Sequence, residues 1–177
     1  MINEVTKGSL FPVEEGAELY NFKFNKGTEY VQAYVLNANS FLDNTTVPYR
    51  LNSACITSEL FGDLRCDCKW QLDEAIKLVK KQGFGIITYH ANHEGKGHGL
   101  SAKLSTFKSN GEVNAKYKNV GKNEEDVRDF STAVEILKYF GVTNVELIGN
   151  NYSKKNYLTA HGIIIKHQTP LIYNLES

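Results

Sequence analysis

The stretch of sequence that decides the fold is residues 69–90, KWQLDEAIKLVKKQGFGIITYH. Its first part carries apolar residues at steps of three and four, the spacing of one helix face, at Leu72, Ala75, Ile76, Leu78 and Val79. This pattern predicts a helix over residues 69–82. Gly83 and Gly85 end the pattern, and residues 86–90, IITYH, are typical of a short buried strand.

Strands and helices alternate on both sides of this segment. Strands are predicted over residues 28–37, 47–57, 145–149 and 163–166. An exposed loop is predicted over 113–123, a helix over 125–140, and a second helix from the turn at 150–155 to about residue 161. Asn123 or Glu124 is expected to cap the first of these helices, and Gly141 to end it. The order indicates one α/β domain over residues 1–177 with parallel strand pairs, although the first strands could form a separate antiparallel layer.

Composition sets the class of protein. The chain has 177 residues, 20 Lys+Arg and 20 Asp+Glu, and 41% of its residues are hydrophobic. These values suit one folded domain and argue against a disordered chain. The zero net charge argues against a nucleic-acid or membrane-surface binder, but not against one small polyanion held in a pocket. No apolar run has the length of a membrane span, and the start MINEVTKGSL has no signal core, so a cytoplasmic protein is expected.

Arginine is scarce in this chain. Among 20 basic residues only Arg50, Arg65 and Arg128 are arginines, so each is a candidate for bidentate binding of a carboxylate or phosphate. Asp126 and Arg128 are expected at the start of the helix over 125–140, where an anion is favoured. The alternatives are leftover arginines in a lysine-rich chain and a solvated acidic first turn.

The three cysteines lie close together in the sequence, as C-x10-C-x-C at Cys55, Cys66 and Cys68. An odd count without an export signal disfavours a disulfide. Three protein ligands with one open position are the arrangement of a catalytic zinc ion. The alternative is that these cysteines are small buried hydrophobic residues.

A glycine-rich polar loop, HANHEGKGHGL, occupies residues 90–100. Its histidines, His90, His93 and His98, could supply a fourth metal ligand or a proton shuttle, or could be ordinary loop residues. Its glycines would allow close approach to a phosphate, but the spacing fits neither a Walker motif nor G-x-G-x-x-G.

Four segments together resemble the GTP cyclohydrolase II family. Residues 53–72, SACITSELFGDLRCDCKWQL, resemble its zinc motif, and residues 93–103, HEGKGHGLSAK, its QEGR-x-x-GL-x-x-K loop. Residues 126–130, DVRDF, match its D-x-R-D-[FY] segment, and residues 149–154, GNNYSK, are similar to its TNNPxK turn. The segments stand in family order within about residues 29–172.

The resemblance implies a mixed sheet with flanking helices, a homodimer, and a zinc enzyme that opens the imidazole ring of GTP and releases formate. Cys55, Cys66 and Cys68 would bind one Zn²⁺ per chain, and Mg²⁺ would accompany the nucleotide. Asp126 and Arg128 would be catalytic, acting in pyrophosphate release. The residues it assigns to the substrate are Arg50, Gln71, Glu94, Lys96, Asn114, Gly149 and Lys154.

This chain departs from the family pattern mainly at the substrate positions. Phe107 stands where the family has a catalytic tyrosine, and Lys96 where it has an arginine. Asn114 and Gly149 replace threonines, and Tyr152 replaces a proline. The box over residues 50–55, RLNSAC, lacks the family's histidine and glutamate.

Three hypotheses follow. The first is a GTP cyclohydrolase of the riboflavin pathway or a specialised branch, which would act on GTP or a related purine nucleotide. The second is a zinc hydrolase that opens a different cyclic C–N bond in a base or nucleoside without a triphosphate. The third is a non-catalytic binding module that keeps zinc for stability.

Overall fold

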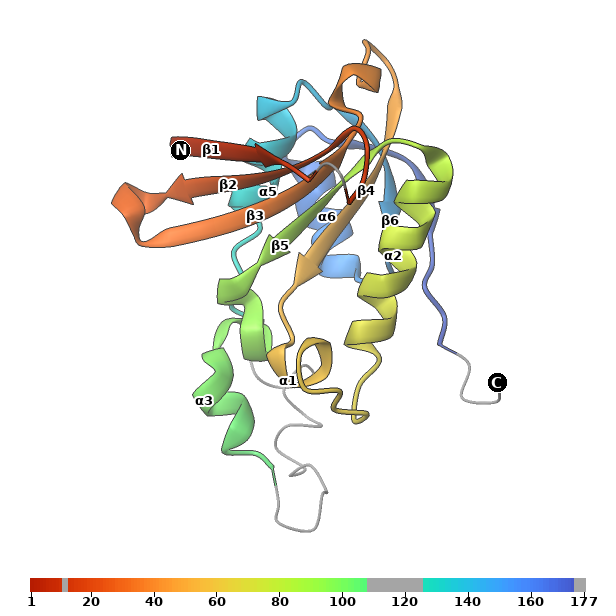
Figure 1. The fold of residues 1–177 in the computed structure, drawn as a ribbon. Helices are drawn as coiled ribbons and strands as arrows, with labels where there is room; N and C mark the ends of the chain where they lie inside the picture. The colour runs from red at the N-terminus through yellow and green to blue at the C-terminus, as the bar shows by residue number, and fades with distance from the viewer. Residues whose placement is uncertain (11–12, 108–125, 174–177) are drawn as a thin grey trace.

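Seven strands form one sheet, and helices cover both of its faces (Figure 1). The computed structural model describes residues 1–10, 13–107 and 126–173. The strands are β1 (Ile2–Ser9), β2 (Ala17–Phe24), β3 (Glu29–Leu36), β4 (Thr46–Ser53), β5 (Gly85–His90), β6 (Asn144–Ile148) and β7 (Ile164–Thr169). The helices are α1 (Ile56–Glu59), α2 (Cys68–Gln82), α3 (Gly99–Leu104), α5 (Ser131–Tyr139) and α6 (Tyr152–Ala160), with short 3₁₀ turns η1 (Asn25–Gly27), η2 (Ala38–Ser40) and η3 (Ala91–Gly97).

The sheet is mixed, in the order β1-β2-β3-β5-β4-β6-β7. Strands β1, β2, β3 and β5 pair antiparallel, whereas β5, β4, β6 and β7 pair parallel. The predicted α/β class with a mixed sheet and flanking helices is therefore confirmed. The alternative of a separate antiparallel layer is wrong, because β3 pairs directly with β5 from Val31–His90 to Leu36–Gly85.

Adjacent side chains of the sheet point to opposite faces and build two cores. Ile86 of β5 lies in a buried cluster with residues of α5 and α6, including Ile136 and Leu158. Its neighbour Ile87 lies in a second cluster with Ala75 of α2. Helix α2 thus covers one face of the sheet, and α5 and α6 cover the other (Figure 1). No helix in the described residues is long and apolar enough to cross a membrane.

Most predicted elements are present, and the largest boundary changes are at two helices and at strands β4 and β7, the latter extending to Thr169 rather than ending at residue 166. Helix α6 begins at Tyr152, inside the segment predicted to be a turn, because the Asn151 side chain caps the amide of Lys154 at 2.9 Å. Strand β4 ends at Ser53, so Cys55 lies beyond the strand that was predicted to carry it. The predicted loop over 113–123 and both proposed caps, Asn123 and Glu124, lie outside the described residues.

The helix predicted from residue 125 begins at Ser131, and residues 126–130 are irregular. Two short-range contacts explain the difference. The Asp126 carboxylate accepts hydrogen bonds from the backbone amide and side chain of Arg128, which competes with helix formation. The Asp129 carboxylate then accepts the amide and hydroxyl of Ser131 at 2.8 Å, where the helix starts. The prediction that Asp126 and Arg128 start a helix is therefore wrong.

Candidate functional site

A cavity of about 390 Å³ opens at the carboxyl ends of β4 and β6. In α/β sheets this edge is where ligands usually bind. The first turns of α2 and α6 also reach it, through Cys68 and Lys154. The residues that line it are Arg50, Leu51, Asn52, Ser53, Cys68, Gln71, Arg128, Leu147, Ile148, Gly149, Asn150, Asn151 and Lys154.

The three cysteines meet beside this cavity. Their sulfur atoms all lie within 4.8 Å of one another, and Cys55 and Cys66 are 3.5 Å apart. Cys55 precedes α1, Cys68 begins α2, and Cys66 is the exposed member of the cluster. Three convergent sulfur ligands suit zinc, which prefers thiolate and imidazole donors. The histidines of the 90–100 loop do not belong to this cluster.

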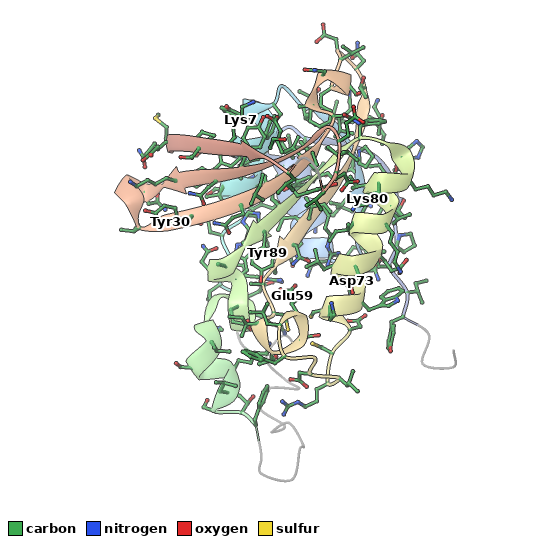
Figure 2. The ribbon with its side chains drawn as sticks, in the orientation of Figure 1. Lys7, Tyr30, Glu59, Asp73, Lys80 and Tyr89 are labelled. Carbon is green, nitrogen blue, oxygen red and sulfur yellow. The ribbon has the colours of Figure 1, made fainter. Side chains whose placement is uncertain are left out.

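Helix α1 is held in place by Glu59. Its carboxylate accepts hydrogen bonds from Asn52 at 2.8 Å, from the amide of Cys55 at 3.2 Å and from Tyr89 at 2.7 Å. Glu59 and Tyr89 lie near each other between α1 and β5 (Figure 2). These bonds tie the short helix that follows Cys55 to the sheet, so the Cys55 sulfur has a defined position.

A buried lysine lies against the cysteines. Lys103, on α3, donates to Cys55 Sγ at 3.0 Å and to Glu94 Oε1 at 2.9 Å, and its side chain is only 5% exposed. Hydrogen bonds from Cys66, Cys68 and Lys103 hold the pKa of Cys55 below that of an ordinary thiol. A cation here offsets part of the negative charge that three thiolates would carry around a metal ion.

Glu94 and Lys96 do not line the cavity in the described structure. The Glu94 carboxylate is buried and already accepts three hydrogen bonds, from Lys103, the amide of Ile56 and the amide of Gly95. Burial, followed by repulsion from Arg128, lowers the pKa of Lys96 from its usual value. Asn114, the other substrate residue taken from the resemblance, lies outside the described residues.

Two buried cations lie in the cavity wall. Arg50 donates to Asn52, to Gln71 at 3.0 Å and to the carbonyl of Ile148 at 3.3 Å. Lys154 donates to the carbonyl of Leu51 at 2.9 Å. Burial, followed by repulsion from Arg50 and Arg128, lowers the pKa of Lys154 well below its usual value. Two desolvated cations so placed favour an anionic ligand.

Arg128 lies at the same cavity and is paired with Asp126. The guanidinium donates to both Asp126 oxygens, with 2.7 Å between Nε and Oδ1. Its Nη1 donates to Ser53 Oγ at 3.2 Å. The pair therefore comes from an irregular segment between α3 and α5 rather than from a helix terminus, and it brings a third cation to the cavity.

Phe107 contacts Arg65, which directly precedes Cys66. The Arg65 guanidinium lies 3.6 Å from the centre of its ring, and Arg65 also donates to Asp63 at 2.8 Å. This stacking gives Arg65 a partner within the protein and places an apolar ring where the family has a tyrosine. No hydroxyl is available at position 107 for proton transfer.

Sequence reasoning missed several residues that the structure brings to the site. Asn52, Ser53 and Asn150 line the cavity, and Lys103 contacts a cysteine. For Lys103 the sequence signal was its place as the last residue of the 93–103 segment, which resembles the family's QEGR-x-x-GL-x-x-K loop, but no role was assigned to it. A buried lysine has no distinctive local pattern, because its partners come from distant parts of the chain.

The comparisons with known proteins identify the family of this chain. The sequence profile described as GTP cyclohydrolase II matches residues 7–170. A protein named GTP cyclohydrolase-2 from Picrophilus torridus is 32% identical over 160 residues, covering 88% of this chain and 80% of that protein. The riboflavin biosynthesis protein RibBA of Staphylococcus saprophyticus is 37% identical over 167 residues, or 91% of this chain. The RibBA of Mycolicibacterium gilvum is 38% identical over 133 residues, or 73% of this chain.

The two kinds of relative differ in length. The matched region is 40% of the Staphylococcus saprophyticus RibBA and 31% of that of Mycolicibacterium gilvum, so this chain spans less than half of either protein. It spans most of the Picrophilus torridus protein. The profile match extends from β1 to the end of β7 and includes all three cysteines, Arg128 and Lys154. The chain is thus a member of the GTP cyclohydrolase II family.

Proposed function

We propose that this chain is a zinc-dependent GTP cyclohydrolase that opens the imidazole ring of GTP and releases formate and pyrophosphate. The observation that carries the proposal is the position of Cys68, which belongs to the three-cysteine cluster and also lines the cavity that holds Arg50, Lys154 and Arg128. A ligand with an anionic tail on the cations would present its other end to the metal site.

The residues present fit a zinc ion. Three sulfur donors within 4.8 Å leave a fourth position for water or substrate. When bound there, zinc would supply Lewis-acid activation of water near neutral pH. The buried ammonium of Lys103 offsets charge at Cys55, and Glu94 holds that ammonium in place.

The protein's own groups bind and orient the nucleotide. Arg50 and Lys154 are held by backbone carbonyls and are therefore pre-organised for phosphate oxygens. Gln71 is fixed between Arg50 and Asp67, through bonds of 3.0 and 2.9 Å, and can contact the base or ribose from α2. Arg128, with Asp126 as its partner, is placed to bind the phosphate from which pyrophosphate leaves.

Other parts of the proposal rest on the family resemblance. They are Mg²⁺ bound with the triphosphate, a homodimer, a cytoplasmic location and a step in riboflavin biosynthesis, as in the names of the RibBA relatives. Magnesium would neutralise phosphate charge that three protein cations leave uncompensated.

The reaction is tested by loading the protein with zinc and adding Mg²⁺ with GTP, GMP, guanosine or guanine. We expect formate from GTP, and a kcat/KM for GMP about 100-fold lower, because one charged hydrogen bond contributes roughly 1.5–3 kcal/mol and two phosphates are missing. Formate is measured with a coupled dehydrogenase, and pyrophosphate in the same sample, because Phe107 replaces the family's tyrosine.

The outcomes separate the hypotheses. Absence of formate from every compound would overturn the cyclohydrolase proposal. Equal turnover of guanosine and GTP would favour the hydrolase that acts without a triphosphate, against which the two buried cations argue. Formate without pyrophosphate would limit the reaction to ring opening.

A second prediction concerns Gly149, whose backbone lies against the guanidinium of Arg50 in the folded protein. Its φ of +140° is rare for residues with a side chain, and a Cβ there would lie 2.7 Å from Arg50 Nη1. We expect Gly149→Ala to displace Arg50, lower the free energy of unfolding by roughly 1–3 kcal/mol and weaken GTP binding about tenfold. Thermal unfolding and calorimetric titration measure the two effects.

Gly141→Ala is the matched control for this change. Gly141 also has a positive φ, +68°, but a Cβ there meets no atom within 4 Å. It should share the loss of stability and keep the wild-type affinity for GTP. Equal weakening of GTP binding by both variants would contradict a specific contact between Gly149 and Arg50.

A further inference from the structure

Two histidines of the glycine-rich loop, His90 and His93, are buried and pack against each other. The rings of His90 and His93 are stacked, with 4.6 Å between their centres and 10° between their planes. Phe130 packs edge-on against His93 at 5.3 Å. His93 is only 2% exposed, belongs to no metal cluster in the described residues and does not line the cavity. Its ring therefore has a fixed orientation but no role in the mechanism above.

The hydrogen bonds of His93 determine its protonation state. Nε2 lies 2.8 Å from the backbone carbonyl oxygen of Asp129, which can only accept, so Nε2 carries a proton. Burial lowers the pKa of His93 to about 4, so the ring is neutral near pH 7. Nδ1 is then an acceptor, and it lies 3.2 Å from Ser53 Oγ. Ser53 must therefore donate its only proton to His93.

This arrangement makes the Ser53 hydroxyl a hydrogen-bond acceptor for Arg128. Because the Ser53 hydroxyl donates its proton to His93, its oxygen can only accept a hydrogen bond from any other group. Arg128 Nη1 donates to this oxygen at 3.2 Å. His93 also holds the carbonyl of Asp129, the residue directly after Arg128. His93 thus contacts both the hydroxyl that accepts from the guanidinium and the backbone next to Arg128. This backbone belongs to residues 126–130, which form neither helix nor strand.

We propose that His93 is a positioning residue that fixes the guanidinium of Arg128 at the cavity, through the hydroxyl of Ser53 and the carbonyl of Asp129. The role of Arg128 in turnover rests on the proposed function, but its placement by His93 does not. A histidine that only filled the core would change stability when replaced, without a specific effect on Arg128.

The test compares His93→Leu, which removes both hydrogen bonds, with His93→Gln, whose amide can donate to Asp129 and accept from Ser53. His167→Gln, at an exposed histidine of β7, is the control. The chain has only three arginines, so the arginine Nε–H region of a ¹⁵N spectrum is simple to assign. We expect the Arg128 signal to shift or broaden in His93→Leu, and to keep its wild-type position in His93→Gln and His167→Gln.

A binding measurement gives a second readout, with inorganic tripolyphosphate as the probe and metal-free protein. We expect His93→Leu to weaken binding about tenfold, the size of one charged hydrogen bond, and His93→Gln to restore it. In an Arg128→Gln background the same leucine substitution should cause no further loss, because its effect passes through Arg128.

Three results would overturn the proposal. They are an unchanged Arg128 signal in His93→Leu, an equal loss of affinity in both backgrounds, and no rescue by glutamine. If His93→Leu does not fold, Ser53→Ala removes the middle link without disturbing the histidine stack, and the same shift of the Arg128 signal is expected. If the Arg128 signal and the tripolyphosphate affinity change as predicted but the protein releases no formate from GTP, the cyclohydrolase proposal is wrong. The role of His93 is then still supported.

Discussion

Replacing Cys66 by serine is expected to abolish zinc binding and formate release while the fold is retained. Cys66 is the exposed cysteine of the cluster, so its sulfur contributes little to the core. Loss of one of three sulfur ligands removes the Lewis acid, and several kcal/mol of lost activation correspond to a decrease in kcat of at least about 1,000-fold. Metal analysis, circular dichroism and the formate assay measure the three properties.

Leu64→Ala is the matched control for this change. Leu64 lies on the same loop and is 94% exposed, so its truncation should leave metal content and turnover unchanged. The wild-type protein should also melt at a higher temperature with zinc than without it, and Cys66→Ser should not respond to zinc. A wild type that never turns over, together with a variant that unfolds, would instead support the non-catalytic module stabilised by zinc.

Replacing Lys154 by methionine is expected to weaken GTP binding and to stabilise the nucleotide-free protein. Its ammonium is buried, with the carbonyl of Leu51 at 2.9 Å as its hydrogen-bond acceptor, and two arginines repel it. A lost charged hydrogen bond of roughly 2–3 kcal/mol weakens binding by about 30- to 150-fold. Methionine has a similar length and no charge to desolvate, so the melting temperature should rise.

The pH dependence of stability is a second measure of the cost of burying Lys154. The pKa of Lys154 is lower in the folded protein than its usual value near 10.5 in the unfolded chain. The unfolded chain therefore binds this proton more tightly, and the wild type should gain stability as pH rises toward 10.5 from the folded-state pKa. Lys154→Met should lack this gain.

Lys155→Met is the control, because its ammonium contacts Gln168 at 3.0 Å on the partly exposed side of α6. It should change neither GTP affinity nor the pH profile. Wild-type affinity for GTP in Lys154→Met would contradict the placement of a phosphate at this lysine.

The parts of the fold that the sequence predicted well have strong local periodicity. Helix α2 differs by one residue from its predicted start, and β3 lies within the predicted strand. Strand β1 was missed because it is an edge strand with mostly exposed residues and no clear alternation. The start of α5 was misplaced because the side chains of Asp126 and Asp129 bind nearby backbone amides, which a count of apolar residues does not detect.

The same division applies to the site. The cysteine spacing indicated a candidate metal-ligand set, and the order of the motifs indicated the family. Local sequence could not show that Arg50 from β4, Lys154 from α6 and Arg128 from an irregular segment meet at one cavity. The resemblance assigned Glu94 to the substrate, which stays a prediction, and only the fold showed that its carboxylate contacts Lys103 and two backbone amides.

The sequence by itself determined the α/β class, the three cysteines that are candidate metal ligands, and the family, because these depend on residue types at short spacing. Only the tertiary structure decided how the strands pair, which cations meet, and which acceptor each of them uses. Those contacts join residues as far apart as Leu51 and Lys154, and burial determines their charge state. The hydrogen bonds of His93 show the same principle, because its neutral ring and its hold on Arg128 arise from distant groups brought together by folding.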